Sequence, residues 1–212
     1  MSATRPYDRI KRVIDAVGAG AGLVVLSPLL LAISIAVACK MGRPVLFVQE
    51  RPGRDGRPFR LIKFRSMLDA DHRNGIHSDA DRLTDFGRTL RSTSLDELPE
   101  LWNVLRGEMS FVGPRPLLMS YLGRYSPEQA RRHEVRPGIT GLAQVSGRNA
   151  VGWDDRFELD VEYVDRRSLM LDAHILWRTI HSVLRRDGVA AEGHVTMPEF
   201  GGSTQTPSGH GG

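Results

Sequence analysis

The hydrophobic pattern begins with one long uncharged run, residues 16–39, which is interrupted at its centre by Ser27 and Pro28. About 20 apolar residues suffice for a helix to cross a bilayer, so the run is long enough. Proline removes a helical hydrogen bond and clashes with the preceding turn, so we expect a bend or break there. Residues 13–40 are therefore predicted to form a helix–break–helix segment in a membrane.

The charges beside this run favour a hairpin that enters and leaves the membrane on one face. Basic residues precede the run at Arg9, Lys11 and Arg12, and Lys40 and Arg43 follow it. Basic flanks are typical of the cytoplasmic side, and a re-entrant hairpin satisfies both of them. A spanning anchor with an incidental proline is the alternative, and this segment alone does not separate the two.

Beyond the run, the polar and apolar pattern predicts a small β-hairpin and several helices. Residues 45–49 and 59–64 are typical of strands, and Pro-Gly and Asp-Gly pairs lie between them. The polar residues 69–81 indicate an exposed loop. Helices are predicted over 84–90, 127–134, 153–163 and 172–186, the last with an apolar face that favours core packing over a membrane surface.

The segment 94–105 is predicted to be a helix, but its start is open. Ser94 and Glu97 match a capping box, which makes Ser94 the N-cap. Pro99 falls beyond the first turn of that helix, where proline fits poorly, so a start near Pro99 is the alternative. In both cases Asp96 and Glu97 lie close to a helix N-terminus.

These elements predict an α+β protein: a re-entrant membrane helical hairpin followed by a compact, mainly helical domain with a small β-hairpin. Residues 136–149 are rich in glycine and turn formers, and we expect a functional loop there. The predicted division is a basic juxtamembrane segment (1–12), the membrane segment (13–40), a catalytic domain (41–197) and a disordered tail (198–212).

Composition narrows the set of partners. The 212-residue chain has a net charge of +4, which suits anionic membrane lipids or phosphorylated substrates. Charge alone also permits nucleic acid, but no recognition motif has the required spacing, so we expect no nucleic-acid partner. The single cysteine, Cys39, excludes a disulfide framework and fits a reducing cytoplasmic setting.

The adjacent pair Asp96-Glu97 is the first candidate for chemistry. A carboxylate can attack phosphorus to form an acyl-phosphate, and a neighbouring carboxylate can hold Mg²⁺. Adjacent residues on a helix point about 100° apart, so one can face the phosphorus while the other holds the metal. Spacing alone favours a simpler interpretation, in which the acidic residues complement the helix dipole.

Basic residues supply the other candidates. Pro114 and Pro116 fix the backbone around Arg115, and a pre-set guanidinium is what bidentate phosphate binding requires. A rigid surface turn explains the same pattern. Weaker candidates, which a solvated basic surface explains as well, are Lys63, Arg65 and Arg148.

Five motifs occur in a specific order: residues 63–67 (KFRSM), 90–99 (LRSTSLDELP), 103–110 (NVLRGEMS), 112–116 (VGPRP) and 136–141 (RPGITG). Together they closely resemble the bacterial sugar transferase family, whose members are monotopic phosphoglycosyl transferases. The resemblance covers residues 11–189 and includes the Ser-Pro break. Several long motifs in the right order make chance implausible.

The resemblance implies an enzyme that moves a sugar phosphate from a UDP-sugar to polyprenyl phosphate, undecaprenyl phosphate by default, and releases UMP. It implies a monotopic protein of the bacterial inner membrane, with its catalytic domain on the cytoplasmic face. By resemblance Asp96 is the nucleophile, Glu97 is associated with Mg²⁺, and Arg115 binds the nucleotide sugar. Other polar active-site positions match Lys63, Arg91, Arg148 and Asp160.

Two alternatives stay open. The same transfer without a covalent step is the first. The second is a non-catalytic, membrane-anchored module that binds anionic lipid; it explains the charge and the hairpin but not the Asp-Glu and Pro-Arg-Pro spacing. The sequence leaves open which sugar is transferred and whether the protein forms a homodimer.

Overall fold

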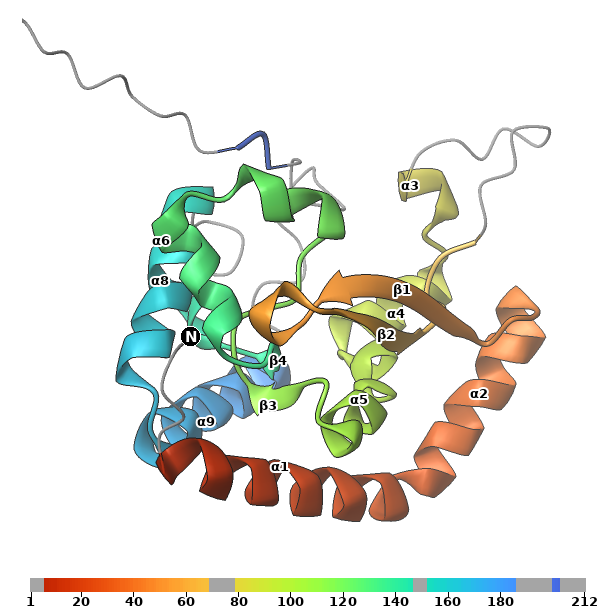
Figure 1. Cartoon of the computed structure of the whole chain (residues 1–212). Coiled ribbons are helices and arrows are strands. Elements are labelled where there is room, and N and C mark those ends of the chain that lie inside the picture. The colour runs from red at the N-terminus through yellow and green to blue at the C-terminus, as the bar shows by residue number, and fades with distance from the viewer. Residues whose placement is uncertain (1–5, 69–78, 147–151, 186–199, 203–212) are drawn as a thin grey trace, which may run out of the picture.

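The computed structural model describes residues 6–68, 79–146, 152–185 and 200–202. It has a helix-rich α+β fold, as predicted. Two N-terminal helices run along the bottom and up one flank in Figure 1, and the remaining elements fill the angle between them. The described residues contain two small sheets, each of two strands.

The hydrophobic run forms two helices, α1 (Pro6–Val25) and α2 (Ser27–Met41), which meet at a bend of 63°. Pro28 has no amide hydrogen to donate to the carbonyl oxygen of Val24, and the Ser27 hydroxyl donates to that oxygen instead, at 2.8 Å. The predicted break at Ser27 and Pro28 is therefore confirmed. Within the described residues, neither helix alone has the length and apolarity to cross a membrane, whereas the bent pair together does.

The predicted β-hairpin is also confirmed. Strands β1 (Leu46–Pro52) and β2 (Pro58–Phe64) pair antiparallel, and the turn η1 (Arg54–Gly56) connects them. Part of the polar stretch 69–81 lies outside the described residues, and its end forms the short helix α3 (Asp79–Arg82). Helix α4 (Asp85–Ser92) follows, close to the predicted range, and the hydroxyl of Thr84 accepts its Gly87 amide at 3.0 Å.

The capping-box interpretation of Ser94 is wrong, and the start near Pro99 is confirmed. Ser94 has a left-handed backbone (φ 55°) and its side chain makes no cap hydrogen bond. The short 3₁₀ turn η2 (Leu95–Glu97) follows, and helix α5 (Glu100–Arg106) begins after its N-cap, Pro99. Proline fits the start of a helix because its missing amide is not needed there.

The described part of the glycine-rich stretch 136–149, which ends at Ser146, is more regular than predicted. Strand β4 (Gly138–Thr140) pairs in parallel with β3 (Ser110–Val112), and helix α7 (Leu142–Val145) follows. The backbones approach so closely that a Cβ atom at Gly138 would lie 2.1 Å from the Gly113 nitrogen. The glycines therefore allow the two strands to pair at close range. Their number indicated a loop because glycine-rich stretches are also typical of loops.

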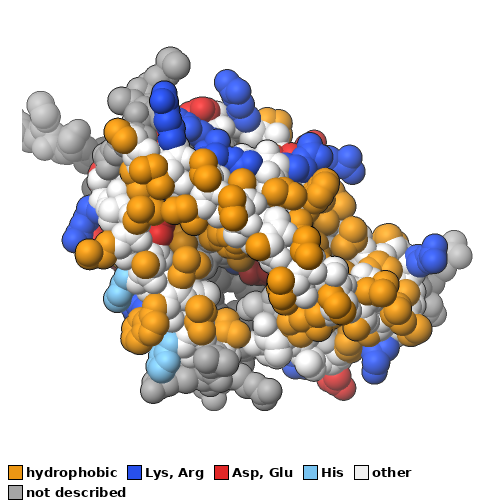
Figure 2. All heavy atoms as spheres, turned by 90° about the horizontal axis from the view of Figure 1, so that it is seen from below, with side chains coloured by type: hydrophobic (Ala, Val, Ile, Leu, Met, Phe, Trp, Pro, Cys, Tyr) orange, Lys and Arg blue, Asp and Glu red, His pale blue; other side chains and the backbone are white. Residues whose placement is uncertain are grey.

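Further helical segments complete the fold: η3 (Met119–Arg124), α6 (Pro127–Ala130), η4 (Arg131–Glu134), α8 (Trp153–Arg166) and α9 (Leu169–Arg185). The core interpretation of the last helix is only partly right. Ile175 is fully buried, but Trp177 and Ile180 are 63% and 61% exposed. Figure 2 shows hydrophobic side chains spread over the face seen from below.

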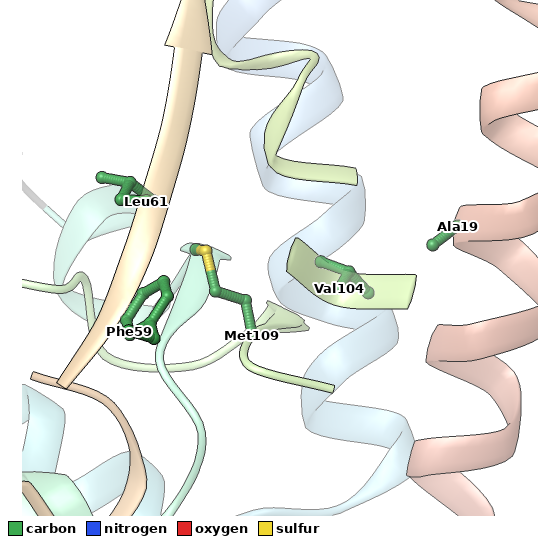
Figure 3. Packing of buried hydrophobic residues seen from close by; sticks show 5 residues of the cluster. All are labelled: Ala19, Phe59, Leu61, Val104 and Met109. Atoms are coloured by element: carbon green, nitrogen blue, oxygen red, sulfur yellow. The ribbon is translucent and has the colours of Figure 1, made fainter. Parts of the chain in front are cut away.

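Two apolar clusters fix the bent helices to the domain. Ala19 of α1 belongs to a cluster with side chains of β2, α5 and the segment after it (Figure 3), namely Phe59, Leu61, Val104 and Met109. Ile33, Val37 and Met41 of α2 pack with Phe64 and Leu90. The helices are thus part of the same packed unit as β2, α4 and α5.

The predicted tail, residues 198–212, is not a disordered segment throughout. Phe200 is buried (3% exposed) in a cluster with Tyr121 and Phe157, so this part of the prediction is wrong. Burial of a large aromatic ring offsets part of the entropy lost on ordering, an effect that composition alone does not show. Residues 198–199 and 203–212 lie outside the described part.

Candidate active site

The Asp96-Glu97 pair lies on the turn η2, between α4 and α5. On either side of the pair, Leu95 and Leu98 pack against the cluster that joins α2, β2 and α4. This packing anchors the turn and leaves Asp96 only 7% exposed. The two carboxylates therefore lie on a turn that the hydrophobic core holds in place.

Glu97 joins two of the predicted basic residues. Its Oε1 atom accepts hydrogen bonds from Lys63 Nζ of β2 and from an Arg115 terminal nitrogen, each at 2.7 Å. Burial alone would raise the pKa of Glu97. The charges and hydrogen bonds of Arg115 and Lys63 outweigh burial and lower the pKa to about 2, so Glu97 is ionised at neutral pH.

Asp96 is in a different electrostatic state. Burial, followed by the negative charge of Glu97, raises the pKa of Asp96 to about 6, against the lowering effect of Lys63, Arg91 and Arg115. A carboxyl group with this pKa is mostly ionised at neutral pH, and its poor solvation makes it a better nucleophile than an exposed aspartate.

Sequence reasoning missed Glu100, which completes this cluster. Its Oε1 atom lies 3.0 Å from Lys63 Nζ, and the residue is 3% exposed. Burial raises its pKa to about 7, with Lys63 opposing and Glu97 adding to the effect. The spacing of three residues from Glu97 was a usable signal, because such residues share one side of a helical turn.

Asp160 and Arg115 are connected through a residue that the sequence did not single out, Arg132. Arg132 donates two hydrogen bonds to Asp160 Oδ2, at 3.0 and 2.7 Å, and one to the Arg115 carbonyl oxygen at 2.7 Å. Both side chains of the ion pair are almost fully buried. Asp160 therefore contacts Arg132, and Arg132 holds the backbone between Pro114 and Pro116.

The other predicted basic residues differ in their relation to the carboxylate pair. Arg91 of α4 donates to the Ser66 hydroxyl at 3.0 Å, and its charge opposes the rise in the pKa of Asp96, so it belongs to the site. Arg65 is buried and donates to the carbonyl oxygens of Met41 and Arg43 at the end of α2, so its described bonds are to backbone. Arg148 lies outside the described residues.

The donor atoms at this site suit a hard divalent cation. In the part of the chain that the structure describes, no group of three or more His, Cys, Asp or Glu side chains has the arrangement of a metal site. Asp96 and Glu97 supply adjacent carboxylates, and Mg²⁺ is typically held by one or two carboxylates together with water and substrate phosphates. The residues present thus fit Mg²⁺ that arrives with a phosphorylated substrate, rather than an all-protein metal site.

A carboxylate pair with Asp96 buried, beside clustered cations, is an arrangement suited to a phosphorylated substrate. The family model described as "Bacterial sugar transferase" matches residues 6–186, so the chain belongs to this family. It is therefore a transferase, and the resemblance found in its motifs is confirmed.

Curated relatives agree with this assignment. The chain is 50% identical over 200 residues to the uncharacterized sugar transferase EpsL of Bacillus subtilis, covering 94% of this chain and 99% of that protein. It is 42% identical over 193 residues to a UDP-glucose:undecaprenyl-phosphate glucose-1-phosphate transferase of Caulobacter vibrioides, covering 85% and 72%. A UDP-galactose-lipid carrier transferase of Erwinia amylovora is 43% identical over 197 residues, which span 84% of this chain but 41% of that protein.

Proposed function

We propose that this enzyme transfers a sugar 1-phosphate from a UDP-sugar to undecaprenyl phosphate, with Asp96 as the covalent nucleophile. The substrate class comes from relatives, because the Caulobacter relative is named for a UDP-sugar donor and the undecaprenyl-phosphate acceptor. The observation that carries the mechanism is the buried Asp96 carboxylate next to Glu97, which Lys63 and Arg115 hold from two other segments. The product begins a lipid-linked surface glycan.

The proposed reaction consists of two successive displacements at the same phosphorus atom. An Asp96 oxygen attacks the β-phosphorus, a bond from that oxygen to phosphorus forms, and the bond to the UMP oxygen breaks with its electrons leaving on UMP. An oxygen of the lipid phosphate then attacks the same phosphorus and the Asp96 carboxylate leaves. Splitting the transfer lets the soluble donor product depart before the lipid reacts.

The surrounding side chains neutralise the transferred group. Arg115 and Lys63, which pair with Glu97 here, are placed to exchange that carboxylate for donor phosphate oxygens. Glu97, with Asp96 beside it, would hold Mg²⁺, which supplies charge neutralisation of the phosphates when bound. Glu100 lies 3.0 Å from Lys63 and can serve as its counter-charge when Glu97 changes partners, because loss of the nearby Glu97 charge lowers the pKa of Glu100.

The bent helices are proposed to insert as a re-entrant hairpin from the cytoplasmic face, near anionic lipids. Two contacts support this topology over a spanning one. At the start of α1, Lys11 Nζ binds Asp172 of α9 at 2.6 Å. At the end of α2, the Arg65 guanidinium donates to Met41. Both ends of the pair are thus held to one domain, whereas a spanning helix separates its ends by about 30 Å.

The deciding experiment is intact-protein mass spectrometry of detergent-purified enzyme mixed with Mg²⁺ and a panel of UDP-sugars, without lipid. We expect one donor to give a sugar-phosphate adduct that maps to Asp96, together with released UMP. Asp96→Asn removes the nucleophilic carboxylate and should abolish adduct and transfer while the protein still folds. Asp85→Asn is the matched control, because Asp85 is a fully exposed acid in α4.

The outcomes separate the alternatives. If no adduct and no UMP form until lipid is added, transfer is direct and the covalent step is refuted. Full transfer by Asp96→Asn would refute the nucleophile. If no donor gives an adduct, UMP or transfer, either without or with lipid, the lipid-binding module is favoured over the enzyme.

A further inference from the structure

Phe200, near the end of the chain, lies beyond the family match, which ends at residue 186. Its ring lies among four aromatic side chains that η3, the segment after it and α8 contribute. Centroid distances from Phe200 are 5.0 Å to Phe157, 5.6 Å to Tyr121, 5.6 Å to Trp153 and 5.9 Å to Tyr125.

Two backbone hydrogen bonds fix this residue in addition to its ring. The Phe200 amide donates to the Tyr121 hydroxyl at 3.1 Å, and Arg124 donates to the Phe200 carbonyl oxygen at 2.6 Å. The amide and carbonyl of Phe200 are both hydrogen-bonded to side chains of η3, and its ring packs against η3 and α8. The contact is thus specific in register as well as apolar.

The rings that pack on Phe200 also contact Arg132. The Arg132 guanidinium carbon lies 5.7 Å from the Tyr125 centroid and 5.5 Å from that of Phe157, and Arg132 donates to the Tyr125 hydroxyl at 3.2 Å. Arg132 in turn donates to the Arg115 carbonyl oxygen at 2.7 Å. A continuous path of contacts therefore joins Phe200 to the arginine that binds Glu97.

We propose that Phe200 is a positioning residue for Arg115, acting through Tyr125, Phe157 and Arg132. This rests on the proposed function, in which Arg115 binds the phosphates of the UDP-sugar donor. Phe200 supports one side of the rings against which Arg132 packs. Without that support the rings shift and Arg132 shifts with them. The hydrogen bond from Arg132 to the Arg115 carbonyl oxygen then no longer holds the backbone of the Pro-Arg-Pro turn in place.

The test compares two truncations and two substitutions at a temperature well below unfolding. A chain ending at Met197 lacks Phe200, whereas a chain ending at Gly202 keeps it and is the matched control. Phe200→Ala removes the ring, and Phe200→Leu restores apolar volume without the flat face. Each is assayed for steady-state transfer with varied UDP-sugar, and for thermal unfolding.

We expect the chain ending at Met197 and Phe200→Ala to raise KM for the UDP-sugar about tenfold, with kcat within about twofold of the wild type. KM for the lipid should not change, Phe200→Leu should be intermediate, and the chain ending at Gly202 should behave as wild type. Unchanged donor KM in Phe200→Ala, with only a lower unfolding temperature, would overturn the proposal. If wild-type protein itself shows no transfer, the proposed function has failed instead.

Discussion

At the residue scale, two aspartates of α8 show how burial decides what a charge does. Asp160 and its partner Arg132 are 2% and 1% exposed at their side chains, whereas Asp165 is 50% exposed and pairs with Arg131. Burial raises the pKa of Asp160, and the charge and hydrogen bonds of Arg132 oppose that rise. Both aspartates belong to ion pairs, but only one pair is removed from water.

Asp160→Asn should therefore destabilise the protein by about 3–5 kcal/mol, because it leaves the Arg132 charge buried without a compensating anion. Asp165→Asn should change stability by about 1 kcal/mol or less, since surface pairs contribute little. Denaturant unfolding of both variants in detergent measures the difference. Equal stability of the two, with donor binding lost only in Asp160→Asn, would instead indicate that Asp160 touches substrate.

The sequence could predict the dyad and its cations at this scale, but not how they are connected. Lys63, Glu97 and Arg115 were each visible in a motif, and the structure brings them within hydrogen-bond distance. Arg132 carries no local signal, because its role depends on a main-chain oxygen that lies 17 positions away. A sequence motif therefore does not reveal a side chain whose partner is a distant backbone atom.

At the element scale, α4 approaches the end of β2 closely enough to require glycine. A Cβ atom at Gly87 would lie 1.9 Å from the Ser66 carbonyl oxygen, a backbone atom that has little freedom to move. Arg91, one turn further along α4, donates to the Ser66 side chain. Helix position and the placement of Arg91 near the dyad thus depend on the same close contact.

Gly87→Ala should destabilise the protein by about 1–3 kcal/mol through overpacking, although alanine is ordinarily the better helix former by about 1 kcal/mol. Gly123→Ala is the control, because nothing lies within 4 Å of a Cβ atom at that glycine. Thermal unfolding measures both. A stabilised Gly87→Ala variant would show that helix propensity, not packing against Ser66, governs this site.

Elements with local signals were predictable and elements with distant partners were not. The β1–β2 hairpin has its strands and turn within one stretch of sequence, so alternation and turn residues sufficed. Strands β3 and β4 have three residues each and pair across more than 20 intervening residues. Such short strands carry too little periodicity to be recognised, and their glycines indicated a loop instead.

At the scale of the whole molecule, the bent helix pair α1–α2 packs with the rest of the described residues as one unit. Arg12 of α1 donates to the carbonyl oxygens of Val104 and Leu105 at the end of α5, each at 2.7 Å. These carbonyls lie in the last turn of α5, where that of Val104 also accepts the Gly107 amide at 3.0 Å, and a basic side chain there complements the helix dipole. Helix α5, which follows the dyad, is thus contacted at its end by the proposed membrane element, so insertion of that element would also position the active site relative to the membrane.

This connection makes the membrane topology testable with cysteines placed before and after the apolar part of the α1–α2 pair. In a Cys39→Ser background, Arg9→Cys marks the exposed start of α1 and Arg57→Cys marks the exposed turn of the domain. Because both positions belong to one packed unit, we expect a membrane-impermeant maleimide to label neither in intact spheroplasts and both after permeabilisation. A periplasmic marker protein reports that the reagent is active, and a cytoplasmic one that the cells are sealed. Labelling of Arg9→Cys alone in intact spheroplasts would mean that the pair spans the bilayer, which requires the Lys11 and Arg12 contacts with the domain to be broken in the membrane.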